Sequence, residues 1–480
     1  MTNSEDQSQG AALAKAASVI LLCVAAVCAA ILVRYAIAGW QLRASGDTGI
    51  SARAIVLFYV IPAIVCPVFA WIALGSRNAA LKANVALAAC ATVLSLYVLE
   101  AAVSVLFPAQ SPNAFARNIE AAKRKGIEFD GRPKYEVIAQ MRKNGEKAYP
   151  QFALSPLFGR EQEYFKPGLL PLAGLSGSTV VVCNELGRYM IYRTDEHGFN
   201  NPPGLHAAPT DVLMVGGSYV EGECVKPGET SPDVIRASFP RTLNLGMGGT
   251  GPLQMLARLR EYGRAAKPKV VIWLHNAGDM DGIMGERQTK FLMKYLDPSF
   301  RQDLASRQAE VDQALLGMLE KAQAEHEAQR VQELEQIARE EGRWWKHIVF
   351  GALRTRLGLM TIADPARKSA DRAGEILVEF DRVVKLAKAE AESWGGKLLF
   401  AYISNPVMPP VAPEFLPVPI LARVEAMGIP AINLHEALVR HPDPASLFAL
   451  GDNWNHPNEA GYRLIGEALV RRLREDPKLK

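Results

Sequence analysis

The stretch DVLMVGGSYVEGECV, residues 211–225, places a short apolar run directly before a glycine-rich turn that carries Ser218. The run has the length and composition of a buried strand, and glycines permit the tight turn that joins a strand to a helix. A hydroxyl at such a turn lies at the amino end of the next helix, where backbone N–H groups favour a developing negative charge. Many α/β proteins carry a serine there, so the stretch alone is a weak indication of catalysis.

Outward from this stretch, short apolar runs alternate with helical segments. The strand-like runs are residues 211–217, 242–246, 269–276, 397–404 and 429–434. The helical patterns are residues 251–266, 368–394, 416–427 and 458–474. This alternation predicts a three-layer α/β/α fold, flavodoxin-like, with a parallel sheet covered by helices on both faces. Ligands of such sheets bind beyond the carboxyl ends of the strands, so functional residues are expected there.

A histidine near the C-terminus is a candidate base. His456 stands in GDNWNHPNEAGYRLIGEALVRRL, residues 451–473, directly before a helical pattern that Asn458 can cap. A base must come within hydrogen-bond reach of the hydroxyl that it activates, and a histidine held over the sheet edge by this helix meets that condition. The alternative interpretation is an ordinary histidine in a surface loop.

Taken together, these segments resemble the SGNH or GDSL family of serine esterases and acyltransferases. Four blocks follow in the order of that family: GGSYVEG at 216–222, NLGMGGTGPLQ at 244–254, VVIWLHNAGDMDG at 270–282 and HPNEAGYRLIGEAL at 456–469. Two further phrases more loosely resemble membrane-anchored bacterial members, namely CNELG at 183–187 and DEHGFNNP at 195–202. The ordered blocks are a much more specific signal than any one of them alone.

The resemblance implies a role for each matching residue. Ser218 would attack an acyl carbonyl, and His456 would accept its proton and later return it to the leaving group. The N–H groups of Ser218 and Gly249 would bind the oxyanion, with a third donor from the third block. Because an ionised carboxylate repels an oxyanion, Asp279 must be protonated, point elsewhere, or leave this role to Asn276.

The chain departs from the family pattern at three positions. Gly217 replaces the aspartate of Gly-Asp-Ser, and Asp279 stands where the family has its oxyanion asparagine. Asn453 stands three residues before the histidine, where the family has its triad aspartate. Asp452 lies one residue further back, and either its carboxylate or a backbone carbonyl would orient His456. These departures keep a second hypothesis open, a catalytically inactive polysaccharide-binding or assembly protein.

Three apolar runs near the N-terminus are each long enough to cross a bilayer, which takes about 20 residues. They lie at about residues 16–38, 54–75 and 83–107. Pro62 and Pro67 in the second run are tolerated in a membrane helix and are unfavourable in a soluble one. The sequence therefore predicts three transmembrane helices, with the lipid bilayer as a partner.

The predicted domain boundaries follow from these changes of pattern. They give an N-terminal tail at 1–15, transmembrane helices at 16–107, a juxtamembrane spacer at 108–175 and an SGNH-like domain at 176–480. A helical insertion at about 283–365 interrupts this domain. Its amphipathic part is interpreted as a surface helix with a solvated face, or alternatively as a lid or a partner-docking arm.

Two observations on location disagree. The basic residues of the loops place the C-terminal part in the cytoplasm by the positive-inside rule. Membrane-tethered members of the family that the chain resembles imply instead a multi-pass protein of the bacterial inner membrane with a periplasmic catalytic domain, and we follow that expectation. Cys183 and Cys224, the two cysteines outside the predicted spans, both lie near the Ser218 turn. A disulfide between them is a hypothesis that would fit an oxidising compartment.

The expected reaction is acyl transfer at an ester, either hydrolysis or O-acetylation of an acylated cell-envelope glycan. A transferase would need a membrane acyl-donor partner, whereas the inactive alternative would serve a polysaccharide-export partner. The net charge of +4 gives no case for nucleic-acid binding. No cofactor and no metal site are expected, because the eight histidines are scattered and no Cys-x-x-Cys or His-x-x-x-His occurs.

Overall fold

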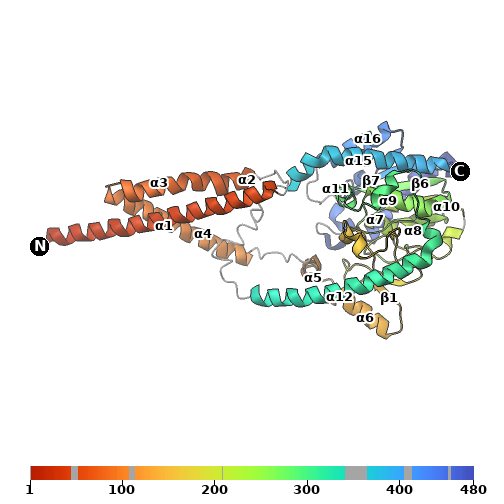
Figure 1. The fold of residues 1–480 in the computed structure, drawn as a ribbon, viewed down its shortest axis with the longest axis horizontal. Coiled ribbons are helices and arrows are strands. Elements are labelled where there is room, and N and C mark those ends of the chain that lie inside the picture. Colours follow the sequence, from red (N-terminus) through yellow and green to blue (C-terminus); the bar gives the residue numbers. More distant parts are fainter. Residues whose placement is uncertain are drawn as a thin grey trace. The chain divides into compact units, whose positions relative to one another are not determined.

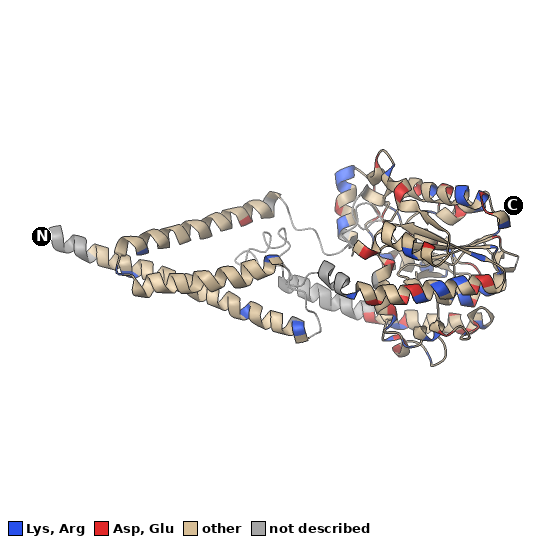
Figure 2. Ribbon diagram, turned by 90° about the horizontal axis from the view of Figure 1, so that it is seen from above, with Lys and Arg blue, Asp and Glu red and all other residues tan. Residues whose placement is uncertain are grey.

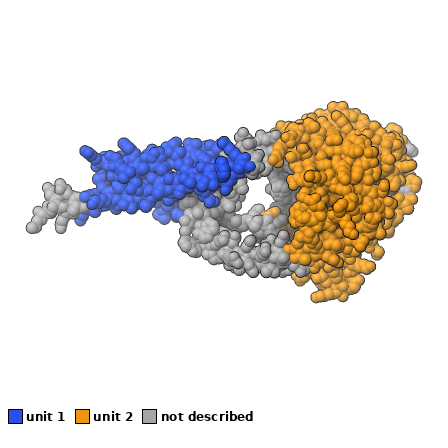
Figure 3. All heavy atoms as spheres, in the orientation of Figure 1, with its two compact units in different colours: residues 1–110, 332–368 blue, residues 111–331, 369–480 orange. Residues whose placement is uncertain are grey.

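The computed structural model describes residues 2–44, 52–106, 114–207, 209–340, 365–404, 413–451 and 456–479. The chain divides into two compact units, shown in Figure 3. The first comprises residues 1–110 and 332–368, and the second comprises residues 111–331 and 369–480. Each unit is described by itself.

The N-terminal unit consists of long apolar helices. They are α1 (Thr2–Ala44), α2 (Ala52–Ile55), a π-helical turn (Val56–Val60), α3 (Ile61–Gly75) and α4 (Ala79–Leu106). Three segments are long and apolar enough to cross a membrane, namely Gln9–Gln41, Ala52–Gly75 and Ala79–Ser104. Figure 2 shows that charged residues are sparse along these helices. The prediction of three helices of membrane-spanning length is therefore confirmed.

The second unit is built on a five-stranded parallel sheet (Figure 1). Its strands are β4 (Val212–Gly216), β5 (Thr242–Asn244), β6 (Val270–Asn276), β7 (Lys397–Ile403) and β8 (Ala431–Asn433). The spatial order is β5-β4-β6-β7-β8, and every neighbouring pair is parallel. This is the 2-1-3-4-5 order of flavodoxin-like sheets. The predicted parallel α/β fold is confirmed.

Helices cover both faces of this sheet because successive strand residues point to opposite sides. Leu213 and Val215 of β4 join one hydrophobic core, whereas Val212 and Met214 join the other. The first core includes side chains from α9 (Pro252–Arg258), α15 (Pro365–Ser393) and α16 (Pro417–Ala426). The second core includes side chains from α8 (Ser231–Arg236), α17 (Leu434–Val439) and α18 (Glu459–Arg474).

A second, three-stranded sheet has the order β1-β2-β3. It consists of β1 (Ala148–Pro150), β2 (Thr179–Val181) and β3 (Ile191–Arg193), with β1 parallel and β3 antiparallel to β2. Phe152, Leu154 and Leu157 follow β1 and lie in the first core of the large sheet. Part of the stretch that the sequence assigned to a spacer therefore contributes core residues to this unit.

The remaining helices of the second unit are α5 (Ala114–Lys125), α6 (Lys134–Lys143), α7 (Ser218–Glu221), α10 (Arg264–Ala266), α11 (Asp279–Glu286) and the part of α12 (Gln308–Glu340) up to Val331. Helix α12 belongs to the predicted insertion. Its residues Val311, Leu315 and Met318 are buried in the first core at helical spacing, which fits an amphipathic helix packed on the domain.

Candidate active site

Ser218 is the first residue of α7, directly after β4 and the turn at Gly217. Two glycines make this turn possible. A Cβ at Gly216 would collide with the Val220 side chain, and one at Gly222, whose φ is +83°, would collide with the Thr230 side chain. The Ser218 side chain is partly exposed at the carboxyl end of β4. This is the sheet edge at which the sequence placed it.

His456 lies just before α18, where Asn458 caps the helix. The Asn458 side chain accepts hydrogen bonds from the backbone N–H groups of Ala460 and Gly461. The His456 ring packs against Tyr219, the residue after Ser218, with ring centroids 5.8 Å apart. Ser218 and His456 therefore come from distant parts of the chain to the same region of the domain.

Glu185 is the carboxylate that binds this histidine. The backbone N–H of His456 donates to Glu185 Oε2 at 2.7 Å, and Nδ1 of the ring lies 3.2 Å from both carboxylate oxygens. A carboxylate on Nδ1 fixes the ring and stabilises its protonated form, as the acid of a catalytic triad does. Sequence reasoning had considered Asp452 for this role, and that residue lies outside the described residues.

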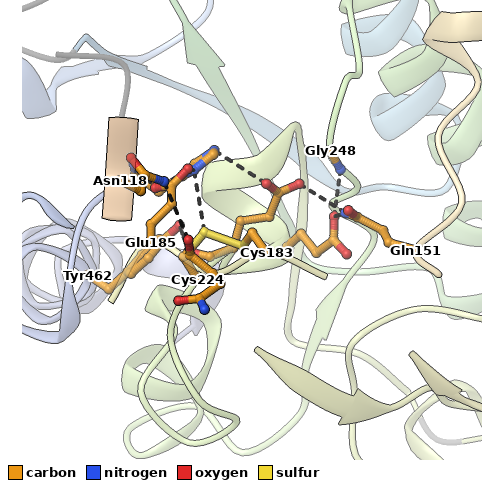
Figure 4. Close-up of a disulfide and its surroundings, with 11 residues drawn as sticks. Asn118, Gln151, Cys183, Glu185, Cys224, Gly248 and Tyr462 are labelled. Atoms are coloured by element: carbon orange, nitrogen blue, oxygen red, sulfur yellow. Dashed lines mark hydrogen bonds and ion pairs between the residues drawn. A yellow bond between two sulfur atoms is a disulfide. The ribbon is translucent and has the colours of Figure 1, made fainter. Parts of the chain in front are cut away.

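Glu185 belongs to the CNELG phrase, residues 183–187, so its segment could have been selected from the sequence. Cys183 begins this phrase, two residues before Glu185. In the structure Cys183 is joined to Cys224 by a disulfide, with α-carbons 5.4 Å apart (Figure 4). Cys224 Sγ lies 3.7 Å from His456 Nδ1. The disulfide thus connects the segment that carries Glu185 to the loop that follows α7, beside the histidine.

A second carboxylate faces the other nitrogen of the ring. His456 Nε2 lies 3.5 Å from Glu223 Oε2. Gln151 Nε2 donates to Glu223 at 2.9 Å and to Glu221 at 2.6 Å, and so connects the two carboxylates. Within the described residues, no hydrogen bond joins Ser218 Oγ to the His456 ring. The ring is therefore held between two acids.

These contacts determine the protonation of the site. Burial lowers the pKa of His456, but the charges of Glu185 and Glu223 outweigh burial and raise it to about 9. At neutral pH the ring is consequently an imidazolium. Burial, and then the neighbouring Glu223, raise the pKa of Glu221, which also accepts a hydrogen bond from Tyr192. Action of His456 as a base therefore requires a higher pH or the loss of one carboxylate contact.

Two of the three departures from the family pattern are neighbours in space. A Cβ at Gly217 would lie 3.5 Å from Asp279 Oδ1, an ordinary van der Waals contact, so the Asp279 carboxyl group lies beside the turn that carries Ser218. Burial raises the pKa of Asp279 well above its ordinary value, although a hydrogen bond of 2.8 Å from the Asn276 N–H opposes this. A protonated Asp279 is a hydrogen-bond donor, which is what a developing oxyanion needs.

Asn276 and Gly249 are the other candidates for binding the oxyanion, and their local structures differ. The Asn276 Oδ1 accepts a hydrogen bond from the Gly278 N–H at 2.8 Å and so stabilises the turn after β6. Gly249 is exposed, has a φ of +67°, and would place a Cβ 2.6 Å from Ser155 Oγ. The left-handed conformation and this close neighbour both favour glycine.

Two buried charged residues hold the loop that carries Gly249. Glu286 accepts hydrogen bonds from the N–H groups of Gly251, Leu253 and Gln254, and burial raises the pKa of Glu286 to about 7. Arg258 donates from Nη1 to Thr250 Oγ1 at 2.6 Å. No sequence motif predicts these roles of Glu286 and Arg258. Their contacts form only when α9 and α11 pack beside the loop.

Comparison with solved structures finds likenesses of low score. A protein described as a lipolytic member of the G-D-S-L family from Desulfitobacterium hafniense DCB-2 is 14% identical, covers 55% of this chain and 98% of its own, and has a TM-score of 0.31. A two-domain esterase active on acetylated mannans is 11% identical, covers 57% of this chain and 52% of its own, and has a TM-score of 0.29. No protein-family model and no curated protein matches the chain.

The class of protein therefore rests on the chain's own topology and site. The sheet order is that of a doubly wound α/β protein whose functional residues belong at the carboxyl ends of the strands. In this region the structure places a partly exposed serine, a carboxylate-bound histidine and the half-buried carboxyl group of Asp279. These are the residue types that acyl transfer through a serine requires.

Proposed function

We propose that this chain is a membrane-anchored serine esterase or O-acyltransferase of the SGNH kind, acting on acyl esters of a cell-envelope glycan. The observation that carries the proposal is the contact of Glu185 with Nδ1 of His456, 3.2 Å apart, in the part of the domain that also holds Ser218. A carboxylate in this position gives the histidine the orientation and charge stabilisation that a general base needs.

In the proposed reaction Ser218 Oγ attacks the acyl carbon while neutral His456 accepts the hydroxyl proton. The oxyanion receives hydrogen bonds from the N–H groups of Ser218 and Gly249 and from protonated Asp279. The imidazolium, stabilised by Glu185, then gives its proton to the departing oxygen. Water or a sugar hydroxyl attacks the acyl-serine in the second step, and this choice separates an esterase from a transferase.

The apolar helices and the resemblance in sequence support the proposed glycan substrate and periplasmic location. A domain tethered by three apolar helices works close to a membrane surface, where envelope glycans are made and modified. An O-acyltransferase would receive its acyl group from a separate membrane partner. A C-terminal alkaline phosphatase fusion tests the proposed periplasmic location, since that enzyme is active only after export. An inactive fusion with a stable chain would contradict the periplasmic assignment.

The catalytic proposal is tested with the full-length chain in detergent. p-Nitrophenyl acetate serves as the ester, and a fluorophosphonate probe serves as a label for an activated serine. The wild-type chain should turn over the ester and take up the label, whereas Ser218→Ala should do neither. Ser306→Ala is the matched control, because Ser306 is exposed and its hydroxyl contacts only a local carbonyl. Equal turnover by wild type and Ser218→Ala would refute a catalytic serine.

A second candidate function is a non-catalytic domain that binds polysaccharide or assists its assembly. The observation that favours it is the position of the His456 ring between Glu185 and Glu223, away from a hydrogen bond with Ser218. Such a domain would bind acetylated oligosaccharide without consuming it. Binding by isothermal calorimetry, together with no Ser218-dependent turnover between pH 6 and pH 10, would favour this candidate over the enzyme.

A further inference from the structure

The residues around the disulfide form a cluster of metal-binding side chains. Glu185, Cys224 and His456 each offer one ligand atom, and these three atoms lie within 4.8 Å of one another. Cys183, Glu223 and Cys224 form a second group with the same property. Both groups share Cys224, so the two clusters adjoin at the sulfur atom of that residue. Figure 4 shows Glu185 beside the two cysteines.

We propose that, once the disulfide is reduced, Cys183, Cys224, Glu185 and His456 bind one zinc ion. Two thiolates, an imidazole and a carboxylate are all established ligands of zinc, and four ligands complete its tetrahedral shell. Thiolate ligands also distinguish zinc from magnesium and calcium, which prefer oxygen. The inference does not depend on the proposed esterase activity, because it concerns binding alone.

The observed spacing suits a single ion. Zinc bonds of about 2.3 Å to sulfur and about 2.0–2.2 Å to nitrogen and oxygen place tetrahedral ligand atoms about 3.3–3.8 Å apart. In the structure Cys224 Sγ lies 3.7 Å from His456 Nδ1, and that nitrogen lies 3.2 Å from Glu185. Both separations involve His456 Nδ1, and both lie within about 0.1 Å of the range that zinc requires. After the S–S bond is broken, the Cys183 side chain must move to bring its sulfur to the fourth ligand position.

The chemical step balances with a phosphine reductant. The phosphine takes an oxygen atom from water and becomes a phosphine oxide, and the S–S bond becomes two thiols. Each thiol releases its proton when zinc binds, because the thiolate is the ligand. His456 also releases a proton, since the Nδ1 lone pair must be free. The carboxylate of Glu185 binds as it stands.

The state of Cys183 and Cys224 depends on whether the domain lies in the periplasm or in the cytoplasm. Disulfides persist in oxidising compartments and are rare in the cytosol. In the periplasm the two cysteines would remain paired, and the His456 ring would stay between Glu185 and Glu223. In the cytoplasm, which the basic residues of the loops favour, the two cysteines would be reduced. They would then bind zinc together with Glu185 and Nδ1 of His456. The same cluster would therefore hold a disulfide in the periplasm and a zinc ion in the cytoplasm.

The test uses the full-length chain in detergent micelles. One sample is reduced with tris(2-carboxyethyl)phosphine and one is left oxidised; both receive excess zinc chloride, are desalted, and are analysed for zinc by mass spectrometry. The reduced wild type should keep one zinc per chain, and the oxidised wild type should keep little. Cobalt(II) in place of zinc should give the near-ultraviolet absorption of a thiolate-bound metal.

Variants assign the ligands and control for folding. Cys183→Ser/Cys224→Ser and His456→Asn should each weaken zinc binding by at least about tenfold. Cys23→Ser/Cys90→Ser also removes two thiols, both outside this unit, and should bind zinc as the wild type does. Circular dichroism shows whether each variant is folded. Zinc retention by reduced wild type that equals that of folded Cys183→Ser/Cys224→Ser, or of the oxidised chain, would overturn the proposal.

Discussion

Replacing Glu223 with glutamine should shift the pH at which the enzyme becomes active. Glu223 faces Nε2 of His456 at 3.5 Å, and Glu185 faces Nδ1 at 3.2 Å. The side chains of His456, Glu185 and Glu223 are only 18%, 14% and 12% exposed, so solvent screens these charges weakly. Glu223→Gln keeps the size of the side chain and removes one of the two charges that stabilise the imidazolium.

The magnitude follows from the effect of one nearby opposite charge. Such a charge within about 4–6 Å moves a pKa by about 1–3, or about 1.4–4 kcal/mol. Glu223→Gln should therefore lower the pKa of His456 from about 9 by at least about 1, to about 8 or below. With a pKa of about 9, only about 1% of the ring is neutral at pH 7. The variant should accordingly raise kcat/KM at pH 7 by on the order of tenfold, and the two proteins should converge above pH 9.

The assay is kcat/KM for p-nitrophenyl acetate from pH 6 to pH 10, with Ser218→Ala subtracted at each pH as the blank. The wild-type profile should rise with pH to a plateau and report the pKa of His456. Glu163→Gln is the matched control, since Glu163 pairs with Arg160 on the surface and should leave the profile unchanged. A midpoint in Glu223→Gln that equals or exceeds that of the wild type would refute this account of the site's electrostatics.

The remaining predictions concern the other parts of the site and the fold. Glu185→Gln should lower kcat by about 10²-fold or more with little change in KM, because the ring loses its orienting charge; unchanged kcat would exclude Glu185 as the triad acid. Asp279→Asn keeps a hydrogen-bond donor and should retain activity, whereas Asp279→Ala should lower kcat by about 10²–10³-fold; equal rates for the two variants would exclude a donor role. Gly249→Ala should reduce kcat by at least about tenfold, because the new Cβ meets Ser155 Oγ in a left-handed backbone, and adding Ser155→Ala should restore part of the loss. Finally, protonation of His456 should stabilise the fold, because its pKa in the folded protein, about 9, lies above the ordinary 6.5. The stabilisation is on the order of 3 kcal/mol. It is complete below pH 6.5 and is lost as the pH rises to 9. Urea unfolding should show this fall in the wild type and a smaller one in His456→Asn.

The sequence by itself indicated the α/β architecture and two residues of the candidate site. Alternating apolar runs and helical patterns specify a parallel sheet with covered faces, because each pattern reflects burial within one element. The three apolar N-terminal runs likewise indicate helices of membrane-spanning length, because the length of an apolar run can be read directly from the sequence. Ser218 and His456 could be selected because each lies next to a local signal, a glycine turn in one case and a helix cap in the other.

Only the tertiary structure decided which groups act on those residues. Glu185 is separated from His456 by 271 positions, and the CNELG phrase that contains it does not show which residue its carboxylate contacts. The same holds for the neighbouring Glu223 and for the close approach of Asp279 to Gly217. Protonation depends on burial and on charges within a few ångströms, and these are fixed when many side chains pack together. Local periodicity therefore specifies the elements of this protein, whereas the proton chemistry of its site is set by contacts between segments far apart in the chain.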